Sequence, residues 1–271
     1  MSVDFLPENF QFSQSNLQAY ERCPRQFFLR YVQGLQWPAS ISLEANKWEE
    51  EIHRGQRFHT WVQQHAIGLD VSKEIASCED VLLQTWWHNY ITKPPSELSV
   101  GQVFSEVAIS VPLPPFRLVA KFDRIIIADD GRAVIVDWKT GQSRPRQEHF
   151  DQCWQTVVYQ YVLAEAADVF IGGPIIGAEA ISLVYWHAGY PRALEPINYS
   201  AAKHQLASKR IAAVIKKISN LAGADFKKTE DKEECKRCEF GAYCGRGQAT
   251  GPDIDIEEYM RQGDVLMGEE F

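Results

Sequence analysis

Long apolar runs are absent from this chain of 271 residues. No segment approaches the roughly 20 consecutive apolar residues that a membrane-spanning helix needs. The opening stretch, MSVDFLPENF, also lacks the basic and then apolar pattern of a secretory signal. We therefore expect no membrane association and a cytoplasmic location. Because 45% of the residues are hydrophobic, the chain can still bury a substantial core, which indicates a soluble globular protein.

Positive charge is also scarce. The formal net charge of -8 argues against attraction of nucleic acid over the whole surface. A Walker A segment is missing as well, so any ATP-driven unwinding must come from another protein. Local basic clusters remain, and they are either solvated helix faces or a track for a polyanion. These clusters are Arg22, Arg25 and Arg30, and Lys203, Lys209, Arg210, Lys216 and Lys217.

The most informative stretch is LVAKFDRIIIADDGRAVIVDWKTG, at residues 118–141. It contains two apolar, β-branched runs separated by an Asp-Asp-Gly sequence at 129–131, which suits a tight antiparallel turn. A buried carboxylate is costly unless it has a partner, yet Asp123 and Asp137 interrupt these runs. The pattern predicts a β-hairpin with strands at Leu118–Ala128 and Arg132–Trp138.

The length of the turn decides how the two carboxylates meet. A three-residue loop would place Asp123 opposite Asp137, roughly 5 Å apart at Cβ, whereas a two-residue loop would offset them by one position. Like charges that face each other in a buried site need a shared proton or a bound cation. Alternation puts Lys139 on the face of Asp137. The D-x-K pattern is therefore either a structural ion pair or a site for a hard divalent cation, with the lysine beside an attacking water.

The rest of the chain predicts helices around a small sheet, an α/β arrangement. His59 lies in the apolar stripe of one helix, either as a core residue or as a ligand, and Glu106 lies on the polar face of a strand. Residues 251–271 form an acidic, poorly patterned tail that we expect to be flexible. Helices are predicted at 13–32 with a break at Cys23-Pro24, and at 44–66, 72–90, 148–167 and 200–221; further strands are predicted at 103–113 and 178–187.

The spacing of the cysteines defines a second constellation. Cys235, Cys238 and Cys244 form a C-x2-C-x5-C pattern in a polar segment. Three thiolates need a remote fourth ligand to complete a tetrahedral zinc site or an iron–sulfur cluster, and Cys23 is the candidate. A disulfide framework is not expected in a cytosolic chain.

Together these motifs resemble the RecB-type branch of the PD-(D/E)XK nuclease superfamily, and within it the iron–sulfur nucleases that include the AddB nuclease domain and the CRISPR-associated adaptation exonucleases. The similarity spans almost the whole chain. Many relatives have a glycine shortly before the first catalytic aspartate, whereas this chain reads Val119-Ala120-Lys121-Phe122, with Lys121 on the face of Asp123. The matching motifs are SNLQAYERCPRQFFLRY with Cys23, GQRFH with His59, AKFDRI with Asp123, VDWKTG with Asp137 and Lys139, QTVVY with Gln155 and Tyr159, and CKRCEFGAYC with Cys235, Cys238 and Cys244.

The resemblance implies a fold and two sites. The expected fold is a restriction-endonuclease-like core in a single domain at 1–250, a small mixed β-sheet flanked by helices, with N-terminal helices and a C-terminal cysteine segment. Glu106 is a further candidate for contact with metal or water. The implied catalytic residues are Asp123, Asp137, Lys139, Gln155 and Tyr159. The implied ligands of Mg²⁺ or Mn²⁺ are His59, Asp123, Asp137 and the carbonyl of Trp138, and those of a [4Fe-4S] cluster are Cys23, Cys235, Cys238 and Cys244.

The implied activity is that of a Mg²⁺- or Mn²⁺-dependent deoxyribonuclease, specifically an exonuclease acting on single-stranded DNA or on ends. The implied pathway is DNA recombination and repair or CRISPR adaptation, with a helicase or CRISPR adaptation proteins as partners. Two alternatives remain open. The chain could be a non-catalytic DNA-binding or scaffold module that keeps the nuclease fold, or a zinc-containing binding protein in which the D-x-K pattern is incidental.

Overall fold

The structure is a computed structural model that describes residues 5–7, 9–35, 43–96, 101–141, 144–171, 177–236 and 238–246, without the side chains of 43–49 and 167–171. The acidic tail predicted at 251–271 lies outside the described residues. The chain divides into two compact units, which we describe separately. The described residues of Met1–Ile52, Pro112–Leu118 and Ser208–Phe271 form the cysteine unit, and those of His53–Val111 and Val119–Ala207 form the sheet unit.

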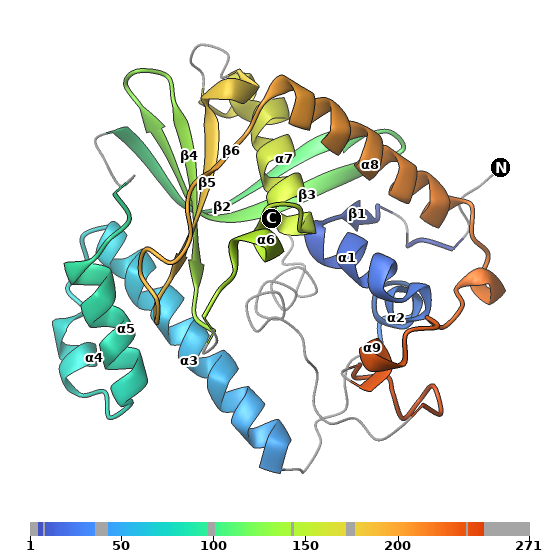
Figure 1. Cartoon of the computed structure of the whole chain (residues 1–271), viewed down its shortest axis with the longest axis horizontal. Coiled ribbons are helices and arrows are strands. Elements are labelled where there is room, and N and C mark those ends of the chain that lie inside the picture. The colour runs from blue at the N-terminus through green and yellow to red at the C-terminus, as the bar shows by residue number, and fades with distance from the viewer. Residues whose placement is uncertain are drawn as a thin grey trace. The chain divides into compact units, whose positions relative to one another are not determined.

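The sheet unit is built on a mixed β-sheet (Figure 1). Strand β3 pairs with β2 and, antiparallel, with β4; β4 runs parallel to β5, and β5 is antiparallel to β6. Every residue of β4 is buried, as its continuous apolar run predicted. The mixed α/β fold is confirmed. The strands are β2 (Gly101–Leu113), β3 (Phe116–Ala128), β4 (Ala133–Lys139), β5 (Ile181–His187) and β6 (Ile197–Asn198). The end of β2 and the start of β3 lie in Pro112–Leu118, which belongs to the cysteine unit.

Helices cover both faces of this sheet. Alternation along β4 sends Val136 and Trp138 to one face, where they pack in a buried cluster with Phe58 of α3 and Trp86 of α5. The intervening Asp137 points to the other face, which α7 covers (Figure 1). These helices are α3 (Leu43–Ala66), α4 (Ser72–Ala76), α5 (Val81–Thr92), α6 (Gln147–Phe150) and α7 (Trp154–Ile171), and a 3-10 turn at Ala178–Ala180 precedes β5.

Two helices predicted as continuous are each divided in two. The helix predicted at 72–90 is broken because Asp80 caps α5: its carboxylate accepts hydrogen bonds from the amides of Leu82 and Leu83, both at 3.0 Å. The helix predicted at 148–167 is interrupted at 151–153 between α6 and α7. In both places the apolar pattern continues across the break, so periodicity alone missed it.

The hairpin has the three-residue turn. The amide of Ala128 donates to the carbonyl of Arg132 at 2.8 Å, and the paired residues begin with Ile127 and Ala133. Gly131 has a φ of +85°, a left-handed conformation that glycine adopts without a steric penalty. The turn therefore sets the register of the two strands that carry Asp123 and Asp137.

The cysteine unit contains the two short N-terminal helices that were predicted, interrupted at Cys23. Ser13 is the N-cap of the first, and it forms a capping box with Asn16. Phe226 stacks on Phe28, with ring centroids 5.0 Å apart, and so joins the C-terminal part to the N-terminal helices. The elements are β1 (Gln11–Phe12), which runs parallel to the start of β3, α1 (Gln14–Arg22), α2 (Pro24–Phe27), a π-helical turn (Phe28–Val32), the later part of α8 (Ala201–Ser219), a 3-10 turn (Gly223–Asp225) and α9 (Lys232–Lys236).

None of the helices in the described ranges combines the length and the apolar character that a bilayer crossing requires.

We predict that Gly131→Ala lowers the free energy of unfolding by about 1 kcal/mol, because alanine is strained at a positive φ. Urea denaturation followed by circular dichroism measures the loss. Gly141→Ala is the control, since a Cβ there would meet only the Nε2 atom of His187, at an ordinary 3.7 Å. Equal losses in both variants would show that the turn conformation is not the cause.

Candidate active site and cysteine site

The polar site of the sheet unit lies where the β3–β4 pairing ends. The last recorded pair is Arg124 with Val136, and one further step of the same register would pair Asp123 with Asp137. Instead, the Oδ2 atom of Asp123 accepts a hydrogen bond from the amide of Trp138 at 2.9 Å. Both aspartates are buried. The end of the hairpin thus replaces backbone pairing with a carboxylate contact and holds the two acidic side chains at adjacent positions.

Asp137 forms a closed triangle with Lys139 and Gln155. The Nζ atom of Lys139 lies 2.9 Å from Oδ2 of Asp137 and donates to Oε1 of Gln155 at 3.0 Å. Gln155, in the first turn of α7, donates from Nε2 to Oδ1 of Asp137 at 2.8 Å. Asp137 is 0% exposed and Lys139 is 4% exposed. Because both charges are buried and hydrogen-bonded, the lysine ammonium has a fixed position.

Tyr185 forms the floor below Lys139. It lies opposite Asp137 in the parallel pairing of β4 with β5, and its ring centroid is 5.4 Å from Nζ of Lys139, a cation–π distance. Burial raises the pKa of Tyr185 well above the usual value. Its hydroxyl therefore stays neutral, and it interacts with the hydroxyl of Thr156 at 2.8 Å.

Asp123 belongs to a second group of polar side chains. Among the residues with described positions, ligand atoms of His59, Glu106 and Asp123 all lie within 4.8 Å of one another. The Nδ1 atom of His59 is 3.7 Å from Oδ2 of Asp123. The structure thus brings together the predicted His59 and Asp123, adds Glu106, and places Asp137 with Lys139. Trp138 contributes its amide to Asp123.

Glu106 reaches this group through an unusual backbone conformation. Its φ is +51° in the interior of β2, a region that residues other than glycine rarely adopt. Such a distortion of a strand redirects a side chain, as β-bulges do. The alternation of residues 103–113 identified Glu106 as polar, but it carried no sign of the positive φ, so sequence reasoning named this residue only as a further candidate for contact with metal or water.

The donor atoms of this group suit a divalent metal ion. Two carboxylate oxygens are the ligand type that Mg²⁺ and Mn²⁺ prefer, and one imidazole nitrogen is typical of transition metals. The ligand atoms of His59, Glu106 and Asp123 lie close enough for one ion to contact them after small side-chain movements. The residues present therefore fit such an ion.

Tyr159 supports the site from behind. Its side chain is fully buried, its hydroxyl donates to the backbone carbonyl of Lys121, and its ring centroid is 4.7 Å from that of Phe122. It holds β3 just before Asp123. Gln152 lies in the exposed turn before α7.

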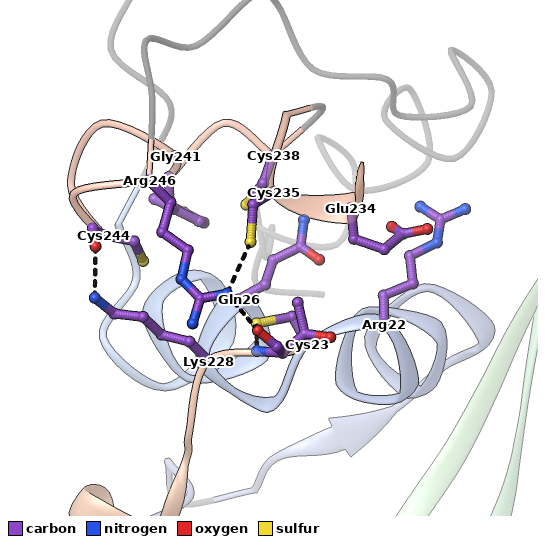
Figure 2. Close-up of a pocket in the computed structure, with 12 residues that line it drawn as sticks. Arg22, Cys23, Gln26, Lys228, Glu234, Cys235, Cys238, Gly241, Cys244 and Arg246 are labelled. Atoms are coloured by element: carbon purple, nitrogen blue, oxygen red, sulfur yellow. Dashed lines mark hydrogen bonds between the residues drawn. The ribbon is translucent and has the colours of Figure 1, made fainter. Parts of the chain in front are cut away.

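The cysteine unit brings four cysteines to one cavity. Cys23 follows α1, Cys235 is in α9, and Cys238 and Cys244 are in the segment after it. Figure 2 shows their side chains around the same space. The amide of Thr229 donates to the sulfur of Cys23 at 3.4 Å. The remote cysteine that the spacing required is therefore close in space to the C-terminal three.

The environment of two of these thiols, those of Cys238 and Cys244, opposes ionisation. Burial raises the pKa of Cys238 to about 12, and the neighbouring charge of Glu239 adds to the effect. Burial also raises the pKa of Cys244. Ionised thiols in this cavity need compensating positive charge, which a bound metal centre supplies.

The separation of the sulfurs bears on the kind of centre. No three of these cysteine sulfurs are within 4.8 Å of one another, since the described residues that meet this criterion are those of the His59 group. A single zinc ion with four thiolates at 2.3 Å would place the sulfurs about 3.8 Å apart. In every set of three of these sulfurs, at least one sulfur–sulfur distance is thus longer than a bound zinc ion requires.

A buried ion pair holds the cysteine segment against the N-terminal helices. Glu239, directly after Cys238, pairs with Arg30 and accepts a hydrogen bond from Nε2 of Gln26 at 3.1 Å. The side chains of Glu239 and Arg30 are 1% and 9% exposed. Sequence reasoning missed this network, although a glutamate inside the cysteine motif was a visible signal.

We predict that Arg30→Met lowers the free energy of unfolding by about 3 kcal/mol, because it leaves the buried carboxylate of Glu239 without its counter-ion. Chemical denaturation of the purified protein measures the change. Arg210→Met is the matched control: Arg210 pairs with Glu21 at 3.0 Å on the surface, where loss of the pair should cost less than about 1 kcal/mol. Comparable costs for the two variants would contradict a stabilising role for the buried pair.

Comparison with known proteins places this geometry in a family. No curated protein matches the chain. The crystal structure of SSO0001 is 16% identical with a TM-score of 0.41 and covers 91% of each chain. The crystal structure of a protein named "Putative exonuclease" from Eubacterium rectale is 14% identical with a TM-score of 0.47; the match covers 96% of this chain and 94% of that one. Residues 11–245 match the model of the PD-(D/E)XK nuclease superfamily, and the chain therefore belongs to that superfamily.

Proposed function

We propose that this chain is a metal-dependent deoxyribonuclease, specifically an exonuclease that hydrolyses phosphodiester bonds in single-stranded DNA or at DNA ends. The main observation in support of this activity is that His59, Glu106 and Asp123 lie together at the strand end where Asp137 and Lys139 form a buried pair. This places a candidate cation site beside a fixed ammonium group. Membership of a nuclease superfamily supports the same activity.

In the proposed reaction, each side chain has a separate role. His59, Glu106 and Asp123 hold a Mg²⁺ or Mn²⁺ ion, and the resemblance adds Asp137 and the carbonyl of Trp138 as ligands. Such an ion lowers the pKa of a bound water and polarises a phosphoryl oxygen. Lys139 orients the attacking water and stabilises the negative charge that develops on the phosphoryl oxygens.

Gln155 and Tyr159 act by positioning. Gln155 contacts both Asp137 and Lys139, so it fixes the orientation of the carboxylate and the ammonium. Tyr159 fixes the backbone of β3 through the carbonyl of Lys121. Both side chains thus restrict the motion of the reacting groups, which lowers the entropy lost on reaching the transition state.

We also propose that the chain belongs to the RecB-type branch and that Cys23, Cys235, Cys238 and Cys244 hold a [4Fe-4S] cluster. Their position around one cavity and their thiol chemistry support this ligand set. The cluster would link residues separated by more than two hundred positions and so reduce the entropy of the unfolded chain. Action in the cytoplasm with a helicase or with CRISPR adaptation proteins is the corresponding biological proposal.

We predict that Asp137→Asn and Lys139→Met each reduce cleavage at least about 100-fold, because they remove a negative charge near the cation or the ammonium that stabilises the transition state. End-labelled single- and double-stranded DNA is incubated with each protein and Mn²⁺, Mg²⁺ or EDTA. Asparagine is used because its amide oxygen can still accept a hydrogen bond from Lys139 in the place of the carboxylate.

Asp130→Asn is the matched control, since Asp130 lies in the exposed turn of the same hairpin and pairs with Arg132. It should cleave as wild type does. Activity of Asp137→Asn equal to that of wild type, or wild-type cleavage that persists in EDTA, would refute the site. DNA binding without any cleavage by wild type would instead indicate a non-catalytic module.

We predict that Cys23→Ser loses iron as completely as Cys235→Ser, Cys238→Ser or Cys244→Ser, because a hydroxyl is a poor replacement for a thiolate. Iron, sulfide and zinc are measured in anaerobically purified protein. Cys153→Ser is the control, and it should keep its iron because Cys153 contacts Thr156 and Tyr185 in the sheet unit. A full iron content in Cys23→Ser, or zinc in place of iron in wild type, would contradict the proposed cluster.

A further inference from the structure

Lys121 lies beside the candidate metal site, and the proposed reaction does not use its side chain. It is on β3, two residues before Asp123, and its Nζ atom is 3.6 Å from Oε2 of Glu106. Glu106 is one of the three residues whose ligand atoms converge. One carboxylate therefore faces both a protein ammonium and the proposed divalent ion.

The backbone fixes both members of this ion pair. The carbonyl of Lys121 accepts a hydrogen bond from Tyr159, and the positive φ of Glu106 sets the direction of its side chain. Their side chains are only 30% and 21% exposed, so solvent screens the pair less than it screens a surface pair. The ion pair of Lys121 with Glu106 is thus a partly buried contact of the candidate metal site.

A count of charges shows what this lysine changes. Glu106, Asp123 and Asp137 contribute -3, His59 is counted as neutral, and Lys139 and Lys121 contribute +2, which gives a sum of -1. One divalent ion raises that sum to +1, which favours a DNA phosphate. A second divalent ion would raise it to +3 and would be repelled by the ammonium groups of Lys121 and Lys139.

We propose that Lys121 is a resident cation of the metal site, which competes with the divalent ion for Glu106 and limits the site to one ion. The inference rests on the proposed function, because it assigns a role to a residue of the same site. Loss of Lys121 removes the ammonium group that pairs with Oε2 of Glu106 and so removes one competitor of the metal ion. Loss of this lysine therefore strengthens metal binding, whereas loss of a metal ligand weakens it.

Titration of Mn²⁺ into the protein without DNA tests the proposal, with free Mn²⁺ followed by electron paramagnetic resonance. Wild type is expected to bind one ion, and Lys121→Met is expected to bind it about three- to tenfold more tightly, the range that a partly screened ion pair gives. Lys121→Arg keeps the positive charge and should remain near wild type. Lys73→Met removes the same charge from an exposed position in α4 and should leave the affinity unchanged.

A double-variant cycle shows whether the effect passes through Glu106. Glu106→Gln should weaken Mn²⁺ binding, and adding Lys121→Met to it should give much less gain than in wild type. Three outcomes would overturn the role of Lys121 but leave the metal site standing. They are an unchanged affinity in Lys121→Met, an equal gain in affinity in both backgrounds, and two bound ions in wild type. Wild type that binds Mn²⁺ no better than Asp123→Asn would overturn the metal site itself, and the proposed nuclease mechanism with it.

Discussion

The buried pair of Asp137 and Lys139 is the interaction on which the site depends. A carboxylate that is 0% exposed has no access to solvent, so the nearby ammonium and the amide of Gln155 must supply its stabilisation. These contacts require that β4, at the centre of the sheet, and α7, on its face, keep a fixed separation. The fold therefore positions the chemistry through the same contacts that make the buried charge tolerable.

This requirement explains why the hairpin opens at its polar end. If pairing continued past Arg124 and Val136, the next pair would bring two carboxylates face to face. The amide of Trp138 instead donates to Asp123, which turns that side chain toward His59 and Glu106. The two aspartates thereby acquire different surroundings. One has a permanent protein cation, and the other joins a group of oxygen and nitrogen donors.

The sequence predicted much of this arrangement because strand signals are local. The β-branched runs and the Asp-Gly pair predicted the hairpin, but they allowed two turn lengths, and the observed pairing of Ile127 with Ala133 distinguishes them. The position of Glu106 depends on a backbone distortion that has no signature in residue type. The three C-terminal cysteines indicated that a remote fourth ligand was needed and made Cys23 the candidate, and the family resemblance implied the same set, although no local pattern predicts a contact across two hundred residues. Arg30 and Glu239 were missed for the same reason.

The exposed turn at 129–131 has a consequence for how this hairpin can vary. Exposed turns at the tips of loops usually accept inserted residues, because the residues there make few contacts. Here the number of residues between Ala128 and Arg132 determines which residue of β4 lies opposite Asp123 on the neighbouring strand. An inserted residue that shifted this pairing by one would move side chains of one strand to the opposite face of the sheet. The tip of the hairpin, although it is accessible to solvent, is therefore constrained in length by the buried residues at its other end.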